Sequence, residues 1–139
     1  MPDVRPLKLF FDGGCRPNPG AMETAVVARG IAWFDDAIGT GDNNDAEWLA
    51  LIHALRVATE LGAVDIILVG DSALVVNQAN GLWPCRSAGL LAHRAVYAGL
   101  AAGFARVRVR RVGRAQNLAG IALQKRRGLR PPLPVPSPG

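Results

Sequence analysis

The chain has 139 residues, half of them apolar, and a formal net charge of +5. This length is sufficient for one domain with a substantial core. The apolar content excludes a chain that is disordered over most of its length. No apolar run approaches the roughly 20 residues that cross a bilayer. The N-terminal stretch MPDVRPLK lacks the apolar segment of a signal peptide, so we expect a cytoplasmic protein.

Sulfur and imidazole ligands are scarce, with two cysteines, two histidines and no CxxC pair. So few possible ligands argue against a zinc site. We expect the two cysteines to be free thiols and not to form a disulfide. The charges are unevenly distributed: residues 106–130 hold nine Lys or Arg and no acid, whereas residues 35–47 hold five acids and no base. A charged run is most often a solvated surface. An acidic centre beside a basic flank nevertheless indicates a metal ion next to a phosphate backbone.

In chain order, the periodicity predicts three strands followed by alternating helices and strands. The first strand, 6–12, ends at GGCRPNPG, which we expect to form a turn. The remaining elements are strands at 22–30 and 31–39, a helix at 46–62, a strand at 64–70, helices at 72–81 and 87–104, a strand at 105–112 and a helix at 115–127. This order predicts an α/β fold with a mixed sheet and helices on its faces.

A domain boundary is expected after residue 127. The segment 128–139, GLRPPLPVPSPG, holds five prolines, which can neither continue a helix nor join a strand ladder. We therefore expect one domain over 1–127 and a disordered Pro-rich tail over 128–139. The PPLP stretch also permits a second interpretation, in which the tail binds an aromatic groove on another protein.

Three acidic residues each have a local explanation. Asp12 precedes Gly-Gly, as a turn aspartate does. Glu47 lies three residues after Asn44, the spacing of a capping box that begins at Asn44. Asp71 precedes Ser72 at the start of a predicted helix, where it can act as a cap.

Taken together, the same acids predict a metal site. Ligands gather beyond the carboxyl ends of parallel strands, and Asp12 and Asp71 both occupy such ends. Helical geometry turns Glu47 toward the sheet. Three neighbouring carboxylates repel one another unless a divalent cation compensates, and such oxygen ligands suit Mg²⁺ or Mn²⁺. Two such ions can activate a water and stabilise the leaving oxygen in phosphodiester cleavage.

The segments that hold these acids resemble the type I ribonucleases H. DGGCRPNPG is similar to that family's D-G-[SG]-C-x-x-N-P-G opening, NNDAEWLALIHAL to its N-N-x-x-E-x-x-A-x-x-x-A-L helix, and GDSALVVNQANG to its D-S-x-x-V-x-x-x-x-x-G element. The resemblance implies a ribonuclease H-like fold, a five-stranded mixed sheet with three antiparallel and then two parallel strands. It also implies cleavage of the RNA strand of RNA–DNA hybrids with Mg²⁺ or Mn²⁺.

The resemblance further implies roles for individual residues. Asp12, Glu47 and Asp71 become catalytic residues and metal ligands. The implied contacts with the hybrid substrate come from Gly14, Cys15, Asn18, Asn43, Asn44 and Asn77. In this interpretation a Gly-rich turn lets the backbone approach ribose 2′-hydroxyls, which distinguish RNA from DNA.

One departure from the family concerns its fourth carboxylate, the aspartate of N-x-x-A-D in the last helix. Counted from Asn117, that position is Ile121, or Gly120 with a one-residue gap, and no acid follows Asp71 anywhere in the chain. We therefore predict a hybrid-cleaving endonuclease whose activity this loss can weaken. The alternative is a catalytically inactive nucleic-acid-binding protein that uses its Arg-rich C-terminal half. A third interpretation is an interaction module recruited through the Pro-rich tail.

Overall fold

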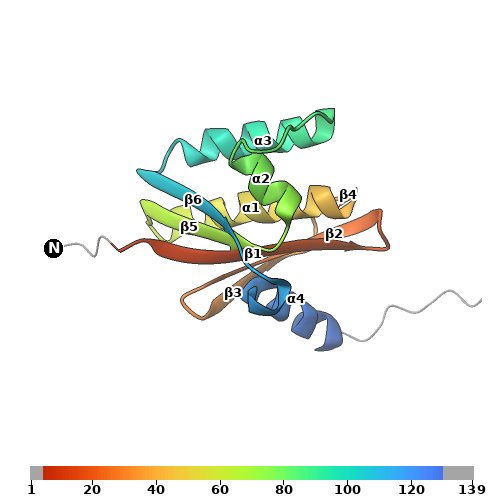
Figure 1. Cartoon of the computed structure of the whole chain (residues 1–139). Coiled ribbons are helices and arrows are strands. Elements are labelled where there is room, and N and C mark those ends of the chain that lie inside the picture. The colour runs from red at the N-terminus through yellow and green to blue at the C-terminus, as the bar shows by residue number, and fades with distance from the viewer. Residues whose placement is uncertain (1–4, 130–139) are drawn as a thin grey trace, which may run out of the picture.

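The computed structural model describes residues 5–129 as a mixed sheet with helices on both faces (Figure 1). The strands are β1 (Leu7–Arg16), β2 (Gly20–Ala28), β3 (Ile31–Asp35), β4 (Thr40–Gly41), β5 (Asp65–Gly70) and β6 (Arg106–Arg111). Their order across the sheet is β3-β2-β1-β5-β6, with β1, β2 and β3 antiparallel and β5 and β6 parallel to β1. This confirms the expected ribonuclease H-like arrangement, to which the short β4 adds a pairing with β2.

Helices cover the two faces of the sheet unequally. They are α1 (Asn43–Glu60), α2 (Ala73–Ala79), α3 (Ala88–Ala101), the 3-10 helix η1 (Arg114–Gln116) and α4 (Leu118–Leu129). Figure 1 shows α1, α2 and α3 on one side of the sheet and α4 alone on the other. None of the helices within 5–129 is long and apolar enough to cross a membrane.

The core is divided by the sheet. The larger cluster, on the α1 side of the sheet, includes Phe11, Trp48 and Leu68, all fully buried. A second, smaller cluster, under α4, includes Val27 and Leu123. Because side chains alternate along a strand, odd-numbered residues of β1 face α1 and even-numbered residues face α4. This alternation decides which helix each residue of the opening motif meets.

The expected turn at residues 13–20 is shorter in the structure. β1 continues through the Gly-Gly pair to Arg16 and pairs with β2, with Gly13 opposite Thr24 and Cys15 opposite Met22. The prediction that the strand ends at residue 12 is therefore wrong. The glycines interrupt the apolar pattern without breaking the ladder. The backbone of α1 lies against the strand at Gly13, and the side chain of Arg127 lies against it at Gly14.

The bounds of the last helix differ from the expected 115–127. The last helix begins at Leu118, after η1, and continues to Leu129, so residue 128 lies within α4. The rest of the predicted Pro-rich tail, 130–139, lies outside the described residues.

Candidate active site

Two acids lie just beyond the parallel part of the sheet. The parallel pairing of β1 with β5 ends at Phe10 opposite Val69. Asp12 is two residues further along β1, and Asp71 follows the last residue of β5. β1 and β5 are neighbours in the sheet, as the convergence of the two carboxylates requires. Asp71 therefore follows a strand end as expected, whereas Asp12 lies within β1, just beyond the end of its parallel pairing with β5.

Glu47 reaches the same edge from α1. The helix is capped by Asp42, whose Oδ1 accepts from the Asp45 backbone N–H at 2.8 Å, while Asp45 Oδ2 accepts from the Asp42 N–H at 3.1 Å. A capping box between Asn44 and Glu47 is therefore not formed, and that alternative is wrong. Glu47 is buried, with 8% of its surface exposed, and its Oε1 accepts from the Gly13 N–H at 2.7 Å.

Gly13 is what allows this approach. A Cβ at that position would lie 2.1 Å from the backbone oxygen of Ala46, well inside van der Waals contact. Gly13 also belongs to the α1-facing residues of β1, so the first turn of α1 rests directly on the strand. Gly13 therefore positions Glu47 against Asp12.

The three acids form one cluster. One carboxylate oxygen from each of Asp12, Glu47 and Asp71 lies within 4.8 Å of the others. Burial raises the pKa of Glu47 well above its ordinary value, and the neighbouring Asp12 charge raises it further. The pKa of Asp12 is also raised, mainly by burial. Glu47 Oε2 is buried and has no hydrogen-bond partner within the described part of the chain. A cluster of repelling, partly unsatisfied carboxylates fits a hard divalent cation.

Asn117 is a site residue that the sequence interpretation used only as a marker for alignment. It is fully buried at the turn between η1 and α4, and its Nδ2 donates to Asp71 Oδ2 at 2.9 Å and to the Phe11 carbonyl at 3.0 Å. Its Oδ1 accepts from the Ala119 N–H at 3.1 Å. One amide thus orients Asp71 and fixes the start of α4 against β1. The sequence signal that identifies Asn117 is its place as the asparagine of the N-x-x-A-D pattern.

The acids lie in a groove of about 780 Å³. Four of the residues predicted to contact substrate line it: Gly14, Cys15, Asn43 and Asn44. Asn18 lies behind them, where its Oδ1 accepts from the Asn43 N–H at 3.2 Å. Asn77 lies on α2, donates to the Ala73 carbonyl at 2.8 Å, and is not among the residues that line the groove.

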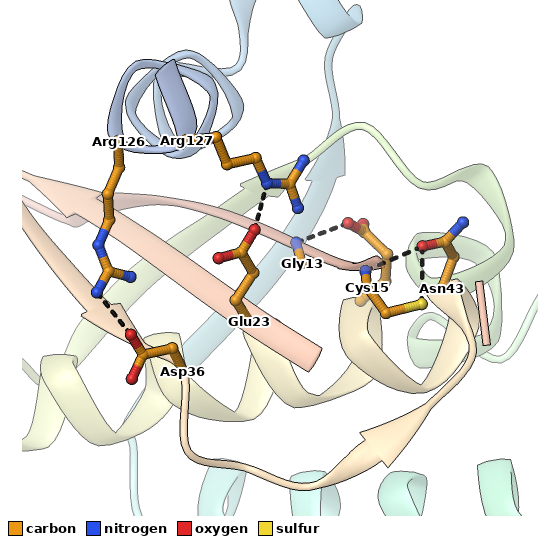
Figure 2. Close-up of polar contacts among 8 residues, drawn as sticks. Gly13, Cys15, Glu23, Asp36, Asn43, Arg126 and Arg127 are labelled. Carbon is orange, nitrogen blue, oxygen red and sulfur yellow. Dashed lines mark hydrogen bonds and ion pairs between the residues drawn. The ribbon is translucent and has the colours of Figure 1, made fainter. Parts of the chain in front are cut away.

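Asn43 holds the edge of the groove together. Its Oδ1 accepts from the Cys15 backbone N–H at 3.2 Å and from the Cys15 thiol at 3.3 Å. Figure 2 shows the side-chain nitrogen of Asn43 turned away from Cys15. The carboxamide therefore ties β1 to the start of α1 through its oxygen.

The wall formed by α4 carries no acid. A Cβ at Gly120 would lie 3.5 Å from Asp12 Oδ2, whereas Ile121 is 42% exposed at the rim of the same groove. Of the two positions considered for a fourth carboxylate, Gly120 faces Asp12 directly. Arg127 and Arg114 also line the groove and draw the pKa of Asp12 down, although burial outweighs them.

A family model described as "Reverse transcriptase-like" matches residues 11–126. The chain belongs to this family. The matched range contains all three acids of the cluster and most of α4.

Individual relatives place this reverse transcriptase-like chain among the ribonucleases H. It is 39% identical over 119 residues to Ribonuclease HI of Halobacterium salinarum. The aligned region covers 82% of this chain and 60% of that relative. The chain thus spans less than two thirds of that relative. The crystal structure of RNase H1 from the same archaeon superposes with a TM-score of 0.80 at 35% identity, over 86% of this chain and 94% of that one.

Two further structures share the fold of the reverse transcriptase-like chain. The N-terminal RNase H domain of Rv2228c from Mycobacterium tuberculosis gives a TM-score of 0.75 at 31% identity, covering 88% of this chain and 96% of that one. LC11-RNase H1, solved in complex with an RNA/DNA hybrid, gives 0.74 at 25% identity, covering 84% and 92%. The fold is that of ribonuclease H.

Proposed function

We propose that the chain is a metal-dependent endonuclease that cleaves the RNA strand of RNA–DNA hybrids. The observation that carries this proposal is the convergence of Asp12, Glu47 and Asp71 from three separate elements, with ligand atoms within 4.8 Å. The likeness to Ribonuclease HI supports it, as does the hybrid held by LC11-RNase H1.

In this proposal the three acids hold Mg²⁺ or Mn²⁺. When bound, such an ion neutralises the carboxylates and supplies the activation of water that phosphodiester hydrolysis needs. The protein contributes the positions of its ligands. The Gly13 N–H fixes one oxygen of Glu47, and the Asn117 amide fixes one oxygen of Asp71.

The groove supplies the proposed contacts with the hybrid. Gly14, Cys15, Asn43 and Asn44 line it and lie beside the acids. We assign Asn18 an indirect part, through its bond to the Asn43 N–H. Asn77 lies on α2 and does not line the groove, so in this proposal it contacts the hybrid only where the hybrid extends beyond the groove along α2.

The test is cleavage of an end-labelled RNA–DNA hybrid with Mg²⁺ or Mn²⁺. We expect product from the wild-type protein and none from Asp12→Asn, which should still bind the hybrid. Asp36→Asn removes the same charge from an exposed position and is the matched control. Absence of product with either metal at high protein concentration would exclude the enzyme.

A second candidate is a hybrid-binding protein without catalysis, and the acid-free wall of α4 favours it. Gly120→Asp places a carboxylate toward Asp12, whereas Ile121→Asp places one at the exposed rim. We expect Gly120→Asp to increase cleavage more than Ile121→Asp does. Hybrid binding with no cleavage by the wild type or either variant would favour the non-catalytic protein.

A further inference from the structure

We infer that Arg127 is a phosphate-binding residue of the groove, held in position by Glu23, and that it contacts a backbone phosphate of the bound nucleic acid. This inference rests on the proposed function, because it names a part of the same substrate. It assigns a role to a residue of the last helix that neither the sequence motifs nor the acidic cluster include.

Arg127 belongs to one continuous face of α4. Gly120, Gln124 and Arg127 follow each other at spacings of four and three residues, which places them on the same side of a helix, and all three line the groove. This face is uncharged where it meets Asp12 and positive at its far end. A polyanion that lies along this face therefore contacts no carboxylate of α4 that would repel it.

The position of Arg127 depends on Gly14. A Cβ on Gly14 would lie 2.9 Å from Arg127 Nη2, so the guanidinium occupies space that a larger residue would fill. Gly14 is an even-numbered residue of β1 and faces α4, and its partner in the ladder is Glu23 of β2. The second glycine of the opening motif thus makes room for an arginine from the opposite end of the chain.

Glu23 orients this guanidinium. Arg127 Nε donates to Glu23 Oε1, and Figure 2 shows that this contact is made through Nε, with one terminal nitrogen pointing away from that carboxylate. The side chains are 24% and 14% exposed, so the pair is only partly screened by water. A guanidinium held through Nε still presents its terminal nitrogens, the geometry with which arginine binds phosphate oxygens. The effect of Arg127 on the pKa of Asp12 agrees with its lying beside the acids.

The neighbouring Arg126 offers a matched comparison. It donates to Asp36 Oδ2 at 2.8 Å, lies over the Phe34 ring at 4.6 Å and does not line the groove. Removal of either arginine changes the net charge equally. A merely structural ion pair between Arg127 and Glu23, which anchors α4 to β2, would make the two substitutions equivalent for hybrid binding.

The experiment measures the affinity of the full chain for a labelled RNA–DNA hybrid, with Ca²⁺ in place of Mg²⁺, over a series of NaCl concentrations. For Arg127→Ala we expect binding about tenfold weaker than wild type. We also expect a slope of log K against log salt that is smaller by about one. Arg126→Ala should leave the slope unchanged. Arg127→Lys keeps the positive charge but loses the paired hydrogen-bond donors of the guanidinium, so this variant should bind the hybrid with intermediate affinity. It replaces Arg127→Ala in the test if the alanine variant fails to fold.

The outcomes separate this inference from the proposed function. If wild type binds and cleaves the hybrid while Arg127→Ala matches Arg126→Ala in affinity and slope, Arg127 is a structural anchor and the inference is overturned. If wild type does not bind the hybrid, the proposed function fails as well. Glu23→Gln supplies a second measurement: it keeps an acceptor for Nε and removes a charge that repels phosphate, so binding should become tighter. Weaker binding would contradict the geometry inferred for Glu23.

Discussion

Asn117 joins three parts of the molecule through a single side chain. Its amide donates to Asp71 and to the Phe11 carbonyl, and its oxygen accepts from the first turn of α4. Loss of this amide leaves a buried carbonyl without its donor and frees Asp71 to rotate. The residue therefore connects the stability of the fold to the geometry of the acids.

We predict that Asn117→Ala lowers the free energy of unfolding by about 1–3 kcal/mol and reduces hybrid cleavage at least about tenfold. Urea unfolding and initial cleavage rates measure the two effects. Asn80→Ala is the control, because Asn80 donates to the Val109 carbonyl at 3.0 Å and does not line the groove. It should leave the cleavage rate unchanged. An Asn117→Ala protein with wild-type activity would show that Asp71 needs no tether.

Glu47 gives the metal-free protein a characteristic dependence on pH. Burial and the Asp12 charge raise its pKa well above the ordinary 4.5. A carboxyl group whose pKa is raised in the folded state contributes stability that is fully present below the unfolded pKa and is lost as the pH rises through the folded pKa. The burial of Glu47 therefore destabilises the metal-free fold at neutral pH.

We expect Glu47→Gln to raise the melting temperature in EDTA by a few degrees at pH 7, with the gain disappearing toward pH 4. His53, whose pKa is lowered by burial, is present in both proteins, so its own contribution largely cancels. Glu60→Gln, at the exposed end of the same helix, is the matched control. Equal melting curves for wild type and Glu47→Gln across this range would contradict the assigned repulsion.

At the scale of secondary-structure elements, β1 is the strand on which both layers of helices converge. The backbone of α1 approaches it at Gly13, and the Arg127 side chain of α4 lies over Gly14 on the opposite face. A side chain at position 13 would hold α1 farther away, whereas one at position 14 would displace only the end of the Arg127 side chain. The separation of α1 from β1 is therefore set by Gly13.

We predict that Gly13→Ala lowers the free energy of unfolding by about 3 kcal/mol or more, since its Cβ would meet the Ala46 oxygen at 2.1 Å. Gly99→Ala on α3, with nothing within 4 Å, should instead be neutral or stabilising by up to about 1 kcal/mol. Chemical denaturation of both variants measures the contrast. Similar stabilities would mean that α1 can shift without cost.

The sequence predicts most elements because their periodicity follows from burial. The apolar run of β5 and the helical spacing of α1 are set by local pattern, and both elements are found as expected. The length of β1 was missed because Gly13 and Gly14 resemble a turn locally, and only the two helices packed on them reveal a strand. The convergence of Asp12, Glu47 and Asp71 is predicted from the expected carboxyl ends of two neighbouring strands and from the side of α1 that carries Glu47. The roles of Arg127 and Asn117 are not predicted, because they depend on contacts with residues 46 to 106 positions away in the sequence.

At the scale of the whole molecule, the proposed binding of a metal ion by the three acids is coupled to folding. Their mutual repulsion opposes folding of the metal-free chain, and a cation bound only to the folded state reverses this. We predict that Mn²⁺ at about 100 times its Kd adds about 2.7 kcal/mol to the free energy of unfolding. Thermal melting with and without Mn²⁺ measures the effect. Asp71→Asn should lose most of the shift, whereas an unchanged shift would place the ion elsewhere.

The position of α4 in the chain has a consequence for protein synthesis. Translation reaches α4 after every other described element, yet this helix supplies one wall of the groove and packs against β2. A nascent chain that has left the ribosome as far as Arg111 already carries all three acids, but Asn117 is not yet available to hold Asp71. We therefore expect the groove to be complete only when residue 127 has emerged, so that the proposed nuclease activity is weaker in a shorter nascent chain.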